Sequence, residues 1–430
     1  MLICAQLSPQ LSLESGLKPN HPNGGCWMYS ERTVWMLFWI LPILLLSGCT
    51  IFKAPPAVEA PPALVRLSPS SYPALTDDLD YDGLDRSIQM SLTYLKKIPA
   101  DRVLTFGLDT YPASHLIRSL ELFRGFIQDN PSADQLEAMV RRDFLVYRAG
   151  GVSEKVLFTG YYEPELNGSL TETPIYRYPV YSRPDDLVNV DLSAFSSKYA
   201  GETITGRYTG QMIVPYYDRK TIENRDFFTG RAPVLVWVDD PVALYFLQVQ
   251  GSGKVKLDEG GILNVHYHTG NGHPYRSVGR ILIEQGKIPR AQMSMQAIRA
   301  YLKDHPDERE SILNANPSYV FFKTETDGPL GNLNVPLTPG RSIAVDKKIF
   351  PPAALVYIQA QKPVVNEAEQ IDTWEGFGRF VLNQDTGGAI TGPGRADIFW
   401  GNGSYAEIAA GHLQHRGEMY FFILKPDAQP

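Results

Sequence analysis

The sequence is poor in cysteine, which excludes two common ways of stabilising a fold. Only three of its 430 residues are cysteines, Cys4, Cys26 and Cys49, and all lie in the first fifty positions. The rest of the chain therefore has no thiols for an internal disulfide or a cysteine metal site. His266 and His268 share one face of a strand-like run, but no acidic or cysteine spacing supports a metal site there. Partly exposed loop histidines are the simpler interpretation, and we expect no metal and no cofactor.

The sequence also lacks an excess of basic residues. Lys and Arg number 40 against 47 Asp and Glu, and the formal net charge is -7. Binding nucleic acid requires a basic surface that neutralises phosphates, so we expect no nucleic-acid partner. Hydrophobic residues make up 43% of the chain, which excludes a wholly disordered protein, and the length suits two domains.

No apolar run reaches the roughly 20 residues that a membrane-spanning helix needs. The longest, 34–46 (VWMLFWILPILLL), has the length of a signal-peptide core and ends just before Ser47-Gly48-Cys49. This end resembles the bacterial lipobox, where the signal is cleaved before a cysteine that is then lipidated. An uncleaved anchor followed by a chance cysteine is the alternative. Thr50, rather than Asp, follows Cys49, and in enteric-type bacteria this implies an outer membrane lipoprotein that faces the periplasm.

The lipobox divides the start of the chain into two segments. Residues 1–48 form the expected signal peptide, with Met28 as an alternative start. Residues 49–75 hold the lipidated cysteine and a tether, because 54–63 (APPAVEAPPA) is rich in proline and alanine. Such a segment is extended and rises about 3.1 Å per residue.

Familiar catalytic motifs are missing. Residues 251–254 (GSGK) look like part of a phosphate-binding loop, but Gln248 and Val255 stand where that loop needs Gly and Ser or Thr. No Gly-x-Ser-x-Gly elbow occurs anywhere in the sequence. Nucleotide binding and serine-hydrolase chemistry are therefore not supported.

Helical and strand-like periodicities follow one another in blocks. The first block is helical, with Asp82 as the expected cap of its first helix, a Ser132–Gln135 capping box on its second, and Gly150 at the end of that helix. The order of helices, strands, helices and strands predicts an α+β first domain that a β-rich insert interrupts. The expected helices are 84–95, 133–149, 275–284, 294–303 and 307–313, and the expected strands are 155–162, 179–182, 234–238, 243–250, 319–322, 355–359, 378–383 and 418–424.

Four unusual segments could carry chemistry. Residues 385–403 (DTGGAITGPGRADIFWGNG) hold six glycines, which suits a close approach to a ligand or an ordinary turn-rich barrel segment. Residues 158–164 (FTGYYEP) place hydroxyls beside aromatic rings, as a sugar site or a half-buried strand would. Residues 248–253 (QVQGSG) would project Gln248, Gln250 and Ser252 from one strand face. In 271–277 (NGHPYRS), Arg276 is a candidate for holding a carboxylate or a helix neighbour.

Taken together, these segments resemble the membrane-bound lytic murein transglycosylase A family. The matching motifs occur in the family's order and cover most of 155–425: FTGYYEP, QVQGSG, GNGHPYRSVG, MSMQAIR, NPSYVFFK and DTGGAITGPGRADIFWG. The resemblance implies a mainly β fold with helices (α+β), in which a glycan groove separates a double-psi β-barrel domain from an inserted smaller β-barrel. The expected bounds are 76–163 and 287–427 for the catalytic barrel and 164–286 for the insert.

The resemblance also implies an activity. The family cleaves the β-1,4 bond between N-acetylmuramic acid and N-acetylglucosamine in peptidoglycan without adding water, and it leaves a 1,6-anhydromuramoyl end. The enzyme would therefore be a lyase. Its expected partners are peptidoglycan glycan strands, the outer membrane through the lipid anchor, and proteins of a wall-synthesis complex.

Site residues follow from the resemblance by position. The C-terminal part is similar to the 3D domain, whose three aspartates would be Asp346, Asp385 and Asp397. Asp397 would be the catalytic acid and Asp385 its support. The loop at 392–396, where family members differ, leaves the detailed spacing between these two open. The residues expected to bind substrate are Thr159, Tyr161, Gln250 and Ser252.

Two other functions stay open at this point. A hydrolytic glycosidase acting on murein would need a second carboxylate, for which Glu163 and Asp385 are candidates. A non-catalytic glycan-binding lipoprotein would bind murein without releasing any fragment. The mass of the product separates these functions, because the anhydro product lacks one water.

Overall fold

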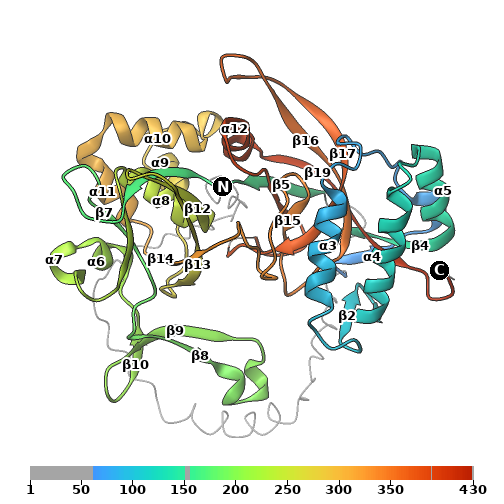
Figure 1. Ribbon diagram of the computed structural model, residues 1–430, viewed down its shortest axis with the longest axis horizontal. Helices are drawn as coiled ribbons and strands as arrows, with labels where there is room; N and C mark the ends of the chain where they lie inside the picture. The colour runs from blue at the N-terminus through green and yellow to red at the C-terminus, as the bar shows by residue number, and fades with distance from the viewer. Residues whose placement is uncertain (1–61, 151–154, 389, 429–430) are drawn as a thin grey trace, which may run out of the picture. The chain divides into compact units, whose positions relative to one another are not determined.

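A six-stranded barrel, which we call the larger barrel, is the first main part of the fold (Figure 1). The computed structural model describes residues 62–150, 155–388 and 390–428. Two strand pairs of the barrel, β15–β17 and β5–β18, are parallel, and β19 closes the ring by pairing with β5. The strands, in ring order, are β5 (Val156–Tyr161), β18 (Arg395–Phe399), β15 (Ser342–Ala344), β17 (Ile371–Asp385), β16 (Leu355–Val365) and β19 (His415–Leu424).

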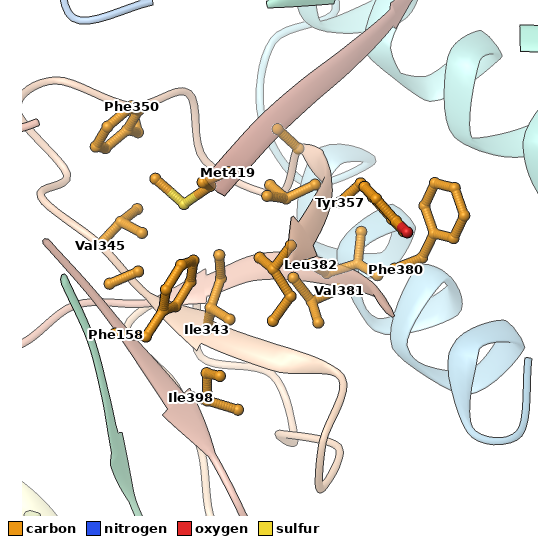
Figure 2. Packing of buried hydrophobic residues seen from close by; sticks show 14 of the residues in the cluster. Phe158, Ile343, Val345, Phe350, Tyr357, Phe380, Val381, Leu382, Ile398 and Met419 are labelled. Atoms are coloured by element: carbon orange, nitrogen blue, oxygen red, sulfur yellow. The ribbon is translucent and has the colours of Figure 1, made fainter. Parts of the chain in front are cut away.

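Apolar side chains from every part of this ring fill its interior. Figure 2 shows Phe158, Ile343, Leu382 and Ile398 packed together, and each of them is fully buried. The helices and strands outside the ring extend or cover it, and these are β1 (Leu64–Arg66), α3 (Leu84–Leu95), β2 (Val103–Phe106), β3 (Asp109–Pro112), α4 (Ala113–Ile127), α5 (Ala133–Asp143), β4 (Phe144–Ala149) and α12 (Ser404–His412).

A second barrel is inserted between β5 and β15. A bridge between Ser182, the residue after β7, and Phe322 of β14 joins the two ends of its sheet. The core of this second barrel contains Val180, Val236 and Val255. Its strands, in spatial order, are β14 (Val320–Glu325), β13 (Ile262–Gly270), β12 (Ser252–Leu257), β6 (Glu165–Ser169), β11 (Val234–Val238) and β7 (Tyr178–Tyr181). The predicted fold class, a double-barrel α+β protein, is confirmed.

The insert carries further elements. A three-stranded sheet consists of β8 (Leu187–Asp191), β9 (Thr203–Tyr208) and β10 (Ile213–Pro215).

Among the described residues, no helix is both long and apolar enough to cross a membrane. The helices that lie between β7 and β15 in the sequence are α6 (Arg219–Glu223), α7 (Arg225–Phe228), α8 (Pro241–Gln250), α9 (Val278–Glu284), α10 (Met295–Asp304) and α11 (Pro306–Asn314), and most buried apolar side chains of α9, α10 and α11 belong to the core of the larger barrel.

Three local predictions were wrong. The run 243–250 is not a strand but most of helix α8, which Asp240 caps and Gly251 ends at a φ of 84°. A short apolar run fits a buried helix as well as a strand, so periodicity could not separate the two. Gly83, not Asp82, is the N-cap of α3. Helix α5 has the predicted capping box but ends at Asp143, and β4 follows it directly.

A buried ion pair joins the start of the fold to the barrel. Both carboxylate oxygens of Asp77 lie within 2.7 Å of the guanidinium nitrogens of Arg341, and both side chains are almost completely excluded from solvent. Asp77 also accepts a hydrogen bond from the backbone N–H of Phe380 in β17. The pair therefore connects the segment before α3 to β17 and to the residue that directly precedes β15.

Candidate active site

Asp397 lies in β18, in the wall of the larger barrel. Its neighbour in the parallel register is Thr159 of β5, whose hydroxyl donates a 2.7 Å hydrogen bond to Oδ1 of Asp397. The Thr159 hydroxyl in turn accepts a hydrogen bond from Nη2 of Arg395, at 3.2 Å. The side chain of Asp397 is 8% exposed.

Burial decides the protonation of Asp397. Loss of water raises the pKa of this carboxyl above its ordinary value, and this outweighs the hydrogen bond from Thr159 and the positive charge of Arg395, which both lower it. Thr159 occupies Oδ1, so Oδ2 is the oxygen that can carry the acidic proton. A carboxylic acid that holds its proton in this way suits general acid catalysis.

Asp385 ends β17 on the other side of β15. Ala344 of β15 pairs with Asp385 on one edge and with Asp397 on the other, so the two carboxyl groups project from the same face. The Tyr161 hydroxyl donates to Oδ2 of Asp385 at 2.8 Å, and the backbone N–H of Asn332 donates to Oδ1 at 2.9 Å. Burial raises the pKa of Asp385 to about 6, and the nearby charge of Asp397 adds to this rise.

Asp346, the third aspartate of the 3D pattern, has a structural position. Its Oδ2 accepts a 2.8 Å hydrogen bond from the backbone N–H of Gly392, and its Oδ1 accepts one from the N–H of Lys348. It therefore fastens the glycine-rich loop between Asp385 and Asp397 to the chain that follows β15. Its carboxylate is occupied by these two backbone groups, which favours a positioning role.

A cavity of about 1070 Å³ connects these groups to the inserted barrel. Asp346, Asp385 and Asp397 line it from the larger barrel, and Gln250 and Ser252 line it from the insert. Tyr161 also lines the cavity, whereas Thr159 does not and acts from behind Asp397.

Gln250 and Ser252 both line the cavity, but they do not lie on one strand as predicted. Gln250 is the last residue of α8 and Ser252 the first of β12, so they do not share a strand face. The side-chain carbonyl of Gln250 accepts a 3.2 Å hydrogen bond from the N–H of Tyr162, while its buried Nε2 has no partner among the described residues. This orphaned donor is suited to an acetamido or hydroxyl oxygen of a sugar.

Two other predicted residues have different positions from those expected. His266 is a buried residue of β13 that lines the cavity, not a partly exposed loop histidine, because the barrel wall covers it. Burial lowers its pKa. Arg276 is exposed and does not line the cavity. No group of three His, Cys, Asp or Glu side chains in the described part of the chain is arranged to hold a metal ion.

Glu163 is not placed to act as a second catalytic carboxylate. Its side chain is 1% exposed and forms a 3.1 Å ion pair with Nζ of Lys254. It also accepts a hydrogen bond from Asn402 and does not line the cavity. Its role is to join the end of β5 to the insert.

Sequence reasoning missed two groups that support the aspartates. Arg395 lies in the glycine-rich segment 385–403, but no role was assigned to it from the sequence. It stands two residues before Asp397, and on a strand this spacing puts both side chains on the same face, which could have indicated its contact with the site. The backbone of Asn332 comes from a connection more than fifty residues before Asp385, and no local signal pointed to it.

We expect Thr159→Val to lower kcat by roughly tenfold or more, because a hydrogen bond to a charged group contributes about 1.5–3 kcal/mol. The same change removes a group that lowers the pKa of Asp397, so that pKa should rise further. Steady-state rates across pH would show both effects. Thr159→Ser, which keeps the hydroxyl, should restore most of the rate, and equal losses in the two variants would contradict the assignment.

Comparison with known proteins shows which family the chain belongs to. The family model described as the MltA specific insert domain matches residues 157–323, and the 3D domain matches 341–423. Membrane-bound lytic murein transglycosylase A of Escherichia coli (strain K12) is 31% identical over 276 residues, which cover 64% of this chain and 67% of that protein. The chain belongs to the membrane-bound lytic murein transglycosylase A family.

Solved structures agree with this family. The crystal structure of membrane-bound lytic murein transglycosylase from Agrobacterium tumefaciens has 30% identity and a TM-score of 0.70, and the match covers 84% of this chain and 98% of that one. The structure of E. coli MltA with bound chitohexaose shows the same fold at 22% identity and a TM-score of 0.62, over 85% of this chain and 95% of that one. The predicted family and enzyme class are confirmed.

Proposed function

We propose that this member of the family cleaves the β-1,4 bond between N-acetylmuramic acid and N-acetylglucosamine with one aspartate. Protonated Asp397 donates its Oδ2 proton to the glycosidic oxygen while positive charge develops at C1 of the muramoyl sugar. The resulting carboxylate takes the proton of the muramoyl O6 hydroxyl, which attacks C1 and closes the 1,6-anhydro ring. An attacker in the same sugar has a high effective concentration and can outcompete water.

The observation that carries this proposal is the pair of unequal aspartates in the cavity. Asp397 is buried with a raised pKa, and a single hydroxyl occupies one of its oxygens. Asp385 accepts hydrogen bonds from a tyrosine hydroxyl and two backbone N–H groups, so it is held in place beside the acid. Thr159, Tyr161, Gln250 and Ser252 are the proposed substrate-binding or positioning residues around them.

Glycan binding is supported by a relative and by the cavity lining. The E. coli MltA was solved with chitohexaose, a β-1,4-linked oligosaccharide. In this chain the cavity offers the unpartnered Nε2 of Gln250 and aromatic faces such as that of Tyr267. Such a combination suits sugars, whose rims form hydrogen bonds and whose faces stack on rings.

The experiment that tests the reaction is mass spectrometry of the fragments that the enzyme releases from purified murein. Anhydromuropeptides, one water lighter than the hydrolysis products, would support the lyase. Reducing-end products would instead support the hydrolase, which would have to use Asp385 because Glu163 lies outside the cavity. Binding without any release would support the non-catalytic lipoprotein.

We expect kcat on isolated glycan strands to fall as pH rises through the raised pKa of Asp397. The acid must be protonated to donate, and its proton is lost above that pKa. A titration of kcat against pH would show one alkaline limb in the wild type, displaced upward in Thr159→Val. A rate that increases as Asp397 ionises would contradict its role as the acid.

The remaining parts of the proposal concern the chain's location and division. Cys49 lies outside the described residues, and its lipidation, with 1–48 as the signal peptide and 49–75 as the lipidated segment and tether, would anchor the enzyme to the outer membrane facing the periplasm. Within that segment, Leu64–Arg66 pairs with β4 as strand β1, so the free part of the tether lies before residue 64. The membrane-bound relatives support membrane association. The proposed division has 76–163 and 287–427 in the catalytic part and 164–286 in the insert. Strand β14 lies in the range 287–427, but it completes the barrel of the insert. Partners in a wall-synthesis complex are also a prediction.

A further inference from the structure

The hairpin formed by β2 and β3 has an apolar tip. Phe106 pairs with Asp109, and the two-residue turn between them is Gly107-Leu108, with Gly107 at a φ of 66°. The position after glycine in such turns usually holds Asn, Asp or Ser. Here it holds a leucine whose side chain is 89% exposed.

A second apolar side chain lies on the same hairpin. Val103, at the start of β2, is 64% exposed, and it pairs with the exposed Pro112 of β3. On the opposite face of the hairpin, Leu104 and Phe106 are buried in the core. The hairpin therefore has an inner face that is buried in the core and an outer face whose apolar groups Val103 and Leu108 are largely exposed.

The hairpin lies where the described chain begins. A side chain added at Gly107 would collide with the backbone carbonyl of Leu64, so the turn packs directly against β1. Pro62 lies thirteen positions after Cys49, and an extended proline-rich segment rises about 3.1 Å per residue. A lipid on Cys49 would thus keep Pro62 within about 40 Å of the membrane surface, and the turn lies beside Leu64, two residues further along the chain.

The surroundings of the hairpin carry a small excess of basic residues, in contrast to the chain as a whole. Residues 66 and 96–112, with Glu121, which forms a 3.0 Å ion pair with Lys96, include four basic and three acidic residues, a balance of 4 − 3 = +1, whereas the full chain has a net charge of -7. The guanidinium of Arg66 lies 3.8 Å from Asp109, next to the turn. The charged residues of this surface are Arg66, Lys96, Lys97, Asp101, Arg102, Asp109 and Glu121, all of them at least partly exposed.

We propose that this hairpin docks on the membrane that holds the lipid anchor. Leu108 and Val103 enter the boundary between headgroups and acyl chains, and the basic residues around them face anionic phospholipid headgroups. The proposal rests on the proposed lipidation of Cys49. Docking gives the catalytic barrel a second point of attachment, so the cavity has a defined orientation to the membrane and does not swing freely on the tether.

The test uses the absence of other thiols. Cys4 and Cys26 leave with the signal peptide and Cys49 is lipidated, so Leu108→Cys in the mature lipidated protein carries the only free thiol. We would label it with an environment-sensitive fluorophore and reconstitute the protein in vesicles of phosphatidylethanolamine and phosphatidylglycerol. We expect the emission to shift to the blue and to be quenched by spin-labelled lipids.

The matched control is Ala368→Cys in the exposed turn between β16 and β17, which Figure 1 draws on the opposite side of the barrel from β2. Its label should remain in water. If the protein floats with the vesicles and both labels stay in water, the docking proposal is overturned while the anchor stands. If the protein does not float at all, the anchor itself is wrong, and docking that depends on it falls too. A blue shift without vesicles would indicate a contact between proteins and would also overturn the proposal.

A second variant tests the energetics with the label moved away from the tip. With Val103→Cys labelled, Leu108→Asn should lower the ratio of docked to undocked protein at least tenfold, since a buried leucine contributes more than the 1.4 kcal/mol that a tenfold change represents. Asparagine suits the turn, so the fold should be kept. Neutral phosphatidylcholine vesicles should weaken docking, and an unchanged ratio in both comparisons would contradict the proposal.

Discussion

Asp397→Asn is expected to lower the release of anhydromuropeptides from purified murein by about 10³-fold or more. Asparagine has nearly the same shape, and its carbonyl oxygen can still accept the hydrogen bond from Thr159. It has no acidic proton for the glycosidic oxygen and cannot later remove the proton from the muramoyl O6 hydroxyl. Loss of general acid–base catalysis accounts for a factor of roughly 10²–10⁴, and here one group serves both steps.

The measurement pairs product mass spectrometry with sedimentation of sacculi. The variant should still bind sacculi and should unfold at a temperature no lower than the wild type, because the change removes a carboxyl that burial disfavours in its charged form. Asp304→Asn, at an exposed aspartate that ends α10, is the matched control and should keep the wild-type rate. Near-normal turnover by Asp397→Asn in folded protein would contradict the role of Asp397 as the catalytic acid.

Asp77→Asn is expected to lower the free energy of unfolding by about 3–5 kcal/mol, because it leaves the guanidinium of Arg341 buried without its counter-charge. The loss should be large for a single substitution, since Asp77 also accepts the N–H groups of Leu79, Tyr81 and Phe380. Denaturant unfolding followed by circular dichroism would measure it. The midpoint should fall while the slope stays near that of the wild type.

Asp85→Asn is the matched control for this prediction. Asp85 pairs with Arg124 at a similar distance, 2.6 Å, but both side chains remain partly in water. Solvent-exposed pairs contribute only about 0.2–1 kcal/mol. Equal losses for the two variants would show that burial of the Asp77–Arg341 pair does not matter, which would contradict the argument.

The sequence by itself determined the family and the identity of the chemical groups. Six motifs in order were enough to predict the family, the fold class and the enzyme class, and the roles of the aspartates at 346, 385 and 397 stay a prediction. Local patterns with a strong chemical signal were also right, such as the Ser132–Gln135 capping box and the strand at 234–238. These features depend on residues that are near one another in the chain, so they can be recognised without the fold.

Only the tertiary structure decided how those groups act. Residues 243–250 form a helix that is buried on two sides, with Tyr245 and Phe246 in the core of the larger barrel and Leu244 and Leu247 in the core of the insert, which the apolar run alone could not reveal. Ala344 lies between Asp385 and Asp397 in register, which places both carboxyl groups on one face. The raised pKa of Asp397 and the pairing of Glu163 with Lys254 likewise depend on burial and on contacts between distant segments. Such contacts arise from strand pairing across more than two hundred residues, as between Thr159 and Asp397.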